Sequence, residues 1–259
     1  MEWTWGPRDT WERLRAFLEA TGRRFAHARA LLVVSAHWEA PVVTVQSSPR
    51  PPLLYDYYGF PPHTYALRWP APGAPELARR ARMLLRAAGI ESAEDPERGF
   101  DHGVFVPLKV AFPDAHLPTF QVSLVEGLDP ALHLRIGEAL APLRDEGVLI
   151  VGSGMSFHNL GLFGRSADPA VDEASRAFDA WLEAVCTGDP DERAAALEHW
   201  ETAPYARLCH PREEHLLPLL VAAGAATGEL GRHLFRDKVM GSWISAFEFG
   251  TPTPAAPTP

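Results

Sequence analysis

Four of the eleven histidines stand at positions where α/β proteins commonly carry ligands and proton carriers. His37 and His158 each follow a short apolar run that reads as a buried strand. His102 lies in the turn Gly-Phe-Asp-His-Gly before a predicted helix, and His215 opens a later helix. Because open α/β sheets bind ligands at the carboxyl ends of their strands, we expect these side chains to converge on one cleft.

The chemistry expected of such a cluster is metal binding. Neutral imidazole is the commonest protein ligand for iron, zinc and copper. Ligands scattered along a chain build a pocket, whereas a structural metal site uses closely spaced pairs. A histidine left over beside such a metal is a natural proton carrier, because its ordinary pKa lies near neutrality. The pattern therefore predicts a catalytic metal pocket.

Each of these features also has a plain structural interpretation. A single histidine at a strand end is more often a hydrogen-bonded surface or core residue than a ligand. Residues 152–156 are compatible with a tight turn or a phosphate cradle, but they lack the Walker lysine and the GxGxxG and GxSxG spacings. His63 stays undecided. The histidines assigned to surface or structural roles are His27, His116, His133, His199, His210 and His233.

Apolar patterning predicts the alternating elements that must position the four histidines. Strands are predicted at residues 30–35, 41–46, 120–125, 148–151 and 242–249. Helices are predicted at residues 10–20, 75–88, 130–144, 169–185, 190–200 and 213–225. The second strand is expected beside the first. This alternation favours a single α/β domain with a mostly parallel central sheet flanked by helices.

Residues 47–75 are rich in proline, tyrosine and glycine, and they are too many for a plain connection. Long loops in compact domains often carry function, so this segment is a candidate substrate lid. Its aromatic side chains, among them Tyr58 and Phe60, are equally compatible with a cover over the core.

Composition narrows the class of protein. The 259 residues suit one sizeable domain, placed at residues 1–250, and the Pro/Thr-rich residues 251–259 are expected to form a disordered tail. The net charge of −9 argues against a nucleic-acid binder, which needs a basic surface. Two cysteines make no disulfide framework, and neither a signal-peptide pattern nor an apolar run of membrane-spanning length is seen. We therefore expect a cytoplasmic protein without nucleic-acid or membrane partners.

Six short motifs then occur in one order: LVVSAHW, YGFP, WPAPGAP, GFDHG, SGMSFHNL and EHLLPL. In this order they resemble the DODA-type (DOPA dioxygenase-like) branch of the class III extradiol, LigB-like, ring-opening dioxygenases, from about Trp5 to Phe249. The resemblance implies the class III extradiol dioxygenase / phosphorylase-like fold. It also implies an enzyme that opens the ring of a small catechol-type aromatic with O2. A homodimer is a candidate assembly.

The resemblance also implies roles for individual residues. His37 and His215 match metal ligands, and the metal is expected to be non-haem Fe(II), with Zn(II) as an alternative occupant. His102 and His158 match the catalytic histidines that flank the substrate, and His158 is an acid/base or an additional metal ligand. The residues expected to contact the substrate are Trp38, Tyr58, Phe60 and Asn159.

The N-terminus departs from the pattern that the resemblance implies. The family normally opens with a strand that ends in His-Gly-(Ser/Ala)-Pro and supplies a further metal ligand, whereas this sequence opens at the stretch that follows it. Either the start codon was assigned too late, which upstream DNA read in frame would show, or the domain lacks that strand. Without it, we expect a site one ligand short, an unpaired edge or a gap in the sheet, and an apolar surface to cover.

Two other functions are compatible with the same residues. The histidines could hold zinc and activate water for hydrolysis. The scaffold could also serve as a non-catalytic binding protein, as in the Memo relatives of the superfamily. Which catechol is cleaved and where its ring opens are not encoded in these motifs.

Overall fold

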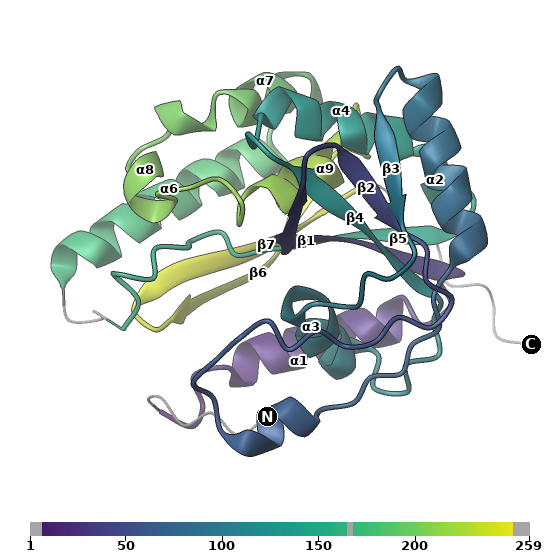
Figure 1. Cartoon of the computed structure of the whole chain (residues 1–259). Helices are drawn as coiled ribbons and strands as arrows, with labels where there is room; N and C mark the ends of the chain where they lie inside the picture. Colours follow the sequence, from purple (N-terminus) through teal and green to yellow (C-terminus); the bar gives the residue numbers. More distant parts are fainter. Residues whose placement is uncertain (1–6, 165–167, 251–259) are drawn as a thin grey trace, which may run out of the picture.

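The first apolar run of the chain forms an inner strand of the sheet. The computed structural model describes residues 7–164 and 168–250. In it, β1 (Ala30–Ala40) lies between β4 (Thr119–Val125) and β5 (Val148–Ser153) and runs parallel to both (Figure 1). The first five residues of β1 are at most 1% exposed, as expected for a strand that is covered on both faces.

The strand order is β3-β2-β4-β1-β5. β2 (Val43–Gln46) pairs with β4 in antiparallel orientation and with β3 (Ser92–Asp95) in parallel orientation. The expectation that residues 41–46 lie beside the first strand is therefore wrong. Both edges of β1 are already taken by strands that return to it parallel, so β2 pairs one position further out. β3, whose sequence Ser-Ala-Glu-Asp carries no apolar alternation, was not predicted.

Alternate residues of β1 face two separate apolar clusters, which explains the helical layers on both sides of the sheet. Leu31 and Val33 pack on the side of α1 (Glu12–Arg24) and α3 (His102–Ala111). Leu32 and Val34 belong to the opposite cluster. The helices that cover this second face are α2 (Pro75–Ala87), α4 (Pro130–Leu140) and α9 (Leu217–Gly224). The predicted α/β fold, mostly parallel and flanked by helices, is confirmed.

Two helix boundaries differ from the predictions for local reasons. The helix predicted at residues 130–144 is divided, because Pro142 has no backbone N–H to continue α4, and a short α5 (Pro142–Asp145) follows. The helix predicted at residues 213–225 begins only at Leu217, so His215 lies in the turn that precedes α9.

The remaining elements lie outside the central sheet. Residues 242–249 form a strand as predicted, but this strand, β7, pairs antiparallel with the unforeseen β6 in a separate two-stranded sheet. Within the described ranges, no helix is both long and apolar enough to cross a membrane. The tail predicted at residues 251–259 is outside these ranges. The other elements are η1 (Pro62–Ala66), α6 (Pro169–Thr187), α7 (Pro190–Glu198), η2 (Trp200–Thr202), α8 (Ala206–Cys209), β6 (Gly231–Val239) and β7 (Ser242–Phe249).

Candidate active site

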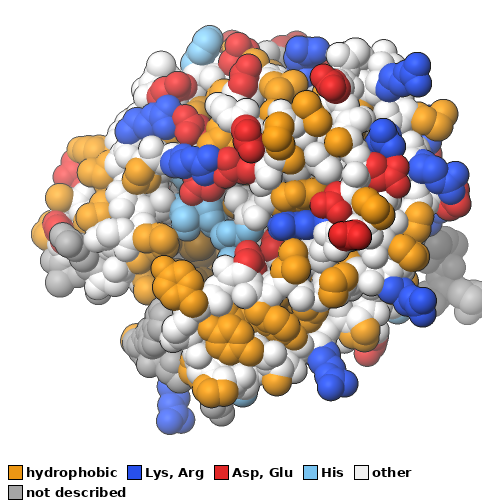
Figure 2. Space-filling model, in the orientation of Figure 1, with side chains coloured by type: hydrophobic (Ala, Val, Ile, Leu, Met, Phe, Trp, Pro, Cys, Tyr) orange, Lys and Arg blue, Asp and Glu red, His pale blue; other side chains and the backbone are white. Residues whose placement is uncertain are grey.

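The four histidines singled out from the sequence come together in one cluster. The ring centroid of His37 lies 3.9 Å from that of His102 and 4.9 Å from that of His215. The rings of His158 and His215 stack, with centroids 3.3 Å apart and an interplanar angle of 16°. Figure 2 shows histidine side chains in a hollow of the surface, with hydrophobic side chains below it and charged ones above. The convergence is as expected, whereas the role of each histidine remains a prediction.

His37 occupies an irregular part of β1. The strand does not end at Ser35, as the apolar run predicted, but continues to Ala40. Its pairing with β4 shifts there, because Val34 pairs with Val122 and Glu39 with Leu124. Five residues of β1 thus advance while β4 advances two. Bulges of this kind are common beside active sites, where they re-aim a side chain.

The start of α3 is packed tightly against this bulge. His102 is the first residue of α3 and not part of a turn before it. A Cβ atom on Gly103 would lie 2.4 Å from Ser35 Oγ and 2.9 Å from Cδ2 of His37. Only glycine therefore allows the helix to approach β1 closely enough to bring His102 beside His37.

Carboxylates back two of the histidines, and sequence reasoning missed both. Nδ1 of His102 donates to Asp56 Oδ1 at 2.9 Å, and Nδ1 of His158 lies 3.2 Å from Glu214 Oε1. A carboxylate on Nδ1 fixes the tautomer and leaves Nε2 available as a base or ligand. Glu214 had a signal in its position next to His215. Asp56 had none, because it lies in the irregular loop of residues 47–75.

Burial keeps the central imidazoles neutral. Desolvation, followed by the nearby His102, lowers the pKa of His37 to about 4. Desolvation and then the neighbouring His158 and His37 lower the pKa of His215 to about 2. Burial also lowers the pKa of His158, against the opposing effect of Glu214. Neutral imidazoles are the form that binds a metal ion.

The donor set suits a transition-metal ion. Donor atoms of His37, Asp56 and His102 lie within 4.8 Å of one another, and so do those of His158, Glu214 and His215. The Nδ1 atom of His215 is buried and has no hydrogen-bond partner among the described residues. Imidazole nitrogens with flanking carboxylates are the ligands that Fe(II) and Zn(II) share.

Two histidines assigned to structural roles are indeed buried and hydrogen-bonded. His133 accepts a hydrogen bond from the Val125 N–H through Nε2 and joins the end of β4 to the start of α4. His210 donates from Nε2 to the carbonyl of Ser156 at 3.1 Å, and the His158 N–H donates to the carbonyl of Cys209. His210 therefore supports the loop that carries His158.

The residues expected to contact substrate lie at varied positions. Trp38 is only 6% exposed and packs against the Arg98 guanidinium at 4.9 Å, and the Asn159 amide donates to the Leu208 carbonyl at 2.8 Å. Tyr58 is 90% exposed. Its neighbour Tyr57 contacts a site histidine, with its ring centroid 5.6 Å from that of His102.

Three further rings of residues 47–75, those of Tyr55, Phe60 and Tyr65, gather around Tyr57, which supports the expectation that this segment covers the site. Phe60 contacts Tyr57 at a centroid distance of 5.4 Å and is 37% exposed. Tyr65 lies 5.2 Å from Tyr57, and the Tyr57 hydroxyl donates to the Thr64 carbonyl at 2.7 Å. The substrate contacts predicted for Trp38, Tyr58, Phe60 and Asn159 stay predictions.

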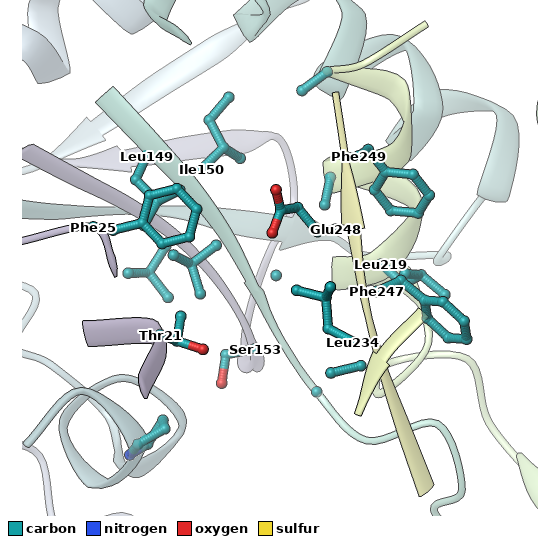
Figure 3. Close-up of a pocket in the computed structure, with 18 of the residues that line it drawn as sticks. Thr21, Phe25, Leu149, Ile150, Ser153, Leu219, Leu234, Phe247, Glu248 and Phe249 are labelled. Atoms are coloured by element: carbon teal, nitrogen blue, oxygen red, sulfur yellow. The ribbon is translucent and has the colours of Figure 1, made fainter. Parts of the chain in front are cut away.

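A cavity of about 1490 Å³ adjoins the histidine cluster. Gly103 and His215 line one end, and the walls include the consecutive residues 148–156 of the β5 region and 244–249 of β7 (Figure 3). Side chains of a strand alternate between its faces, so an unbroken run of lining residues means that the strand presents its edge. β5 is the edge of the described sheet, and β7 pairs only with β6. Among the described residues, β5 and β7 therefore face this cavity with edges that pair with no further strand.

Comparison with known proteins gives matches over most of the chain. Residues 6–248 match the family described as the catalytic LigB subunit of aromatic ring-opening dioxygenase. The chain is 41% identical over 217 residues to the 4,5-DOPA dioxygenase extradiol of Beta vulgaris, which spans 83% of this chain and 78% of that protein. It is 40% identical over 235 residues to dioxygenase tasH of Hapsidospora irregularis, spanning 86% and 72% respectively.

The fold has a solved relative as well. The crystal structure of an uncharacterized protein from Escherichia coli K12 covers 89% of this chain, and 90% of its own length is matched, with a TM-score of 0.74 and 31% identity. Both the sequence match over nearly the whole chain and the shared fold lead to one assignment. The chain belongs to the LigB family of aromatic ring-opening dioxygenases.

Proposed function

We propose that this LigB-family enzyme opens the ring of a small catechol by extradiol dioxygenation at the histidine cluster. The observation that carries the proposal is the meeting of four histidines from four separate elements in one hollow, two of them backed by carboxylates. The relatives named 4,5-DOPA dioxygenase extradiol support a catechol of the dihydroxyphenyl type.

The metal ligands in this proposal are His37 and His215, with His158 as a third. His37 and His215 have pKa values far below neutrality, and the half-buried contact of His158 Nδ1 with Glu214 leaves its Nε2 free. A bound ferrous ion would supply the site with a template for the diol and dioxygen and with electron transfer between them. Zinc would occupy the same donors without redox chemistry.

His102 is the proposed acid/base. Its Nδ1–H is held by Asp56, so Nε2 takes the proton from a phenolic hydroxyl, and the carboxylate stabilises the imidazolium that forms. Burial tends to raise the pKa of Asp56, but the side-chain and backbone hydrogen bonds from His102 outweigh it and lower that pKa. Asp56 therefore stays ionised throughout the reaction. His102 holds this proton and returns it as the ring opens; if His158 is not a ligand, its free Nε2 is a second base beside the substrate.

The aromatic residues of the 47–75 segment are proposed to hold the substrate ring. The rings of Tyr57 and His102 are in a T-shaped contact, with an interplanar angle of 89°. A catechol placed beside His102 would meet the same aromatic surface, and an aromatic contact of this kind adds about 0.5–1.5 kcal/mol to the burial of an aromatic pair.

The two buried, unpaired thiols, Cys186 and Cys209, support a reducing compartment such as the cytoplasm.

The experiment is an anaerobic reconstitution with Fe(II), followed by addition of a dihydroxyphenyl substrate and oxygen. Oxygen uptake that matches the appearance of a coloured ring-opened product is the expected result. The His37→Ala protein and a zinc-loaded sample serve as controls and should consume no oxygen. If the Fe(II) protein consumes none across a panel of catechols, while the zinc form hydrolyses ester substrates, the hydrolase alternative replaces this proposal.

A further inference from the structure

The backbone of His37 is held by a closed ring of polar groups. Its N–H donates to Ser35 Oγ at 3.2 Å, and Ser35 Oγ donates to Asp101 Oδ1 at 2.6 Å. The other oxygen of Asp101 accepts from the Arg98 guanidinium at 3.0 Å. The same guanidinium nitrogen reaches the His37 carbonyl at 3.4 Å, which closes the ring.

This ring replaces strand pairing that the bulge removes. Between Val34 and Glu39 the register of β1 against β4 is interrupted, so the peptide groups of His37 have no regular ladder there. Buried backbone groups need other partners, and Ser35 and Arg98 supply them. Ser35 and Asp101 are both 0% exposed, so the ring lies inside the protein.

The Asp101 side chain takes part in this ring and does not cap α3. It stands at the N-cap of α3, a position where aspartate usually accepts a backbone N–H of the helix. Its carboxylate is directed to Ser35 and Arg98, and the N–H of His102, the first residue of the helix, donates to Asp56 at 2.9 Å. Asp56 thus hydrogen-bonds to His102, whereas Asp101 holds Ser35 and Arg98, which contact the backbone of His37.

We propose that Asp101, acting through Ser35 and Arg98, is the positioning residue that orients His37 toward the metal. This inference rests on the proposed ligand role of His37. A partner behind a ligand typically changes metal affinity by roughly 10–100-fold when it is removed. Asp101 touches no ligand atom itself, so its effect passes through the backbone of the bulge.

The chain offers a matched control in Asp179. This carboxylate is 1% exposed, accepts from Ser245 Oγ at 2.6 Å and pairs with Arg236 at 2.7 Å, the same serine and arginine arrangement. It lies on α6 and contacts Arg236 of β6 and Ser245 of β7. Asp101→Asn and Asp179→Asn should therefore lower the thermal midpoint of the metal-free protein to similar extents, while only Asp101→Asn should weaken metal binding.

The test measures zinc affinity by chelator competition, independently of turnover. We expect zinc affinity to fall by roughly 10–100-fold in Asp101→Asn and by a similar factor in Ser35→Ala. In the double variant the loss of binding free energy should be smaller than the two single losses added together, because both residues act in the same ring. Wild-type affinity in Asp101→Asn, or an equal loss in Asp179→Asn, overturns the proposal. If Asp101→Asn does not fold, Arg98→Lys tests the same ring from its 19% exposed side. Unchanged affinity in His37→Ala would instead refute the ligand assignment.

Discussion

Asp56 accepts two hydrogen bonds from His102 with a single oxygen, one from its backbone N–H and one from Nδ1, both at 2.9 Å. One carboxylate oxygen therefore caps α3 and fixes the tautomer of the proposed base. A substitution that removes the charge of Asp56 should therefore also change the tautomer of His102.

Asp56→Asn should lower kcat by about 100-fold or more, the usual contribution of a positioned base. The amide can donate to Nδ1, which places the proton on Nε2 and removes the base. Steady-state oxygen uptake measures the effect, and bound iron should stay unchanged. Asp129→Asn is the control, because Asp129 also caps a helix, by accepting from the Ala131 N–H at 2.9 Å. A full-rate Asp56→Asn enzyme would remove His102 from the role of base.

Tyr57→Ala should raise KM by roughly 3–10-fold, the equivalent of one aromatic contact, with a smaller effect on kcat. The adjacent Tyr58→Ala should leave both constants unchanged, because Tyr58 is 90% exposed and Tyr57 contacts His102. The pair differs by one position in the chain, so expression and loop composition are matched. Equal KM values for the two variants would show that substrate does not reach this wall.

Gly103→Ala should destabilise the protein by about 1–3 kcal/mol, the usual range for overpacking. The new Cβ would lie 2.4 Å from Ser35 Oγ and 2.9 Å from His37, so the helix or the bulge must move. Zinc affinity should fall as well. In Gly161→Ala the nearest described atom would be Asn159 Oδ1 at 3.4 Å, and stability should change by less than about 0.5 kcal/mol. Denaturant unfolding compares the two.

The histidines of the site could be predicted because each follows a strand or turn signal that local patterning reveals. Asp56 could not, since nothing in an irregular loop indicates that it meets a helix start 46 residues later. The choice between Tyr57 and Tyr58 depends on the path of that loop, which has no periodicity. The position of β2 next to β4 depends on which strands pair with the two edges of β1. The apolar pattern of a single strand does not indicate strand order.

The metal-free protein should lose stability as the pH falls below about 6.5. Burial lowers the folded-state pKa of His210 to about 4, and that of His37 likewise, while the unfolded chain keeps ordinary values. Between these pH values the unfolded state binds more protons, so the free energy of unfolding rises with pH. Each such histidine contributes about 1.4 kcal/mol per pH unit in the steep region.

His210→Gln isolates one proton of this dependence. Glutamine keeps a donor for the Ser156 carbonyl but does not titrate. Urea titrations between pH 6.5 and 5 should therefore show a shallower pH dependence than the wild type, by about one proton. An unchanged slope would mean that His210 is accessible to protons in the folded state.

The cavity between β5 and β7 should bind apolar dyes in the native state. Its walls carry Leu149, Leu219 and Phe247, and the facing strand edges leave it unfilled by side chains of the described residues. Anilinonaphthalene sulfonate should therefore fluoresce with folded protein. Ala246→Trp places a large ring in this space, and it should reduce dye binding and raise the thermal midpoint.

The gain expected for Ala246→Trp is roughly 1.5 kcal/mol if the ring is buried, or about 3–6 °C for a chain of this size. Met83→Trp on α2 is the control, because Met83 is 63% exposed and does not line the cavity. It should change neither property. If the wild-type protein binds no dye and Ala246→Trp lowers the midpoint, the two strand edges meet in solution and the cavity is closed there. Dye loss with a higher midpoint instead means that β5 and β7 stay apart, and that the open edges limit the stability of the fold.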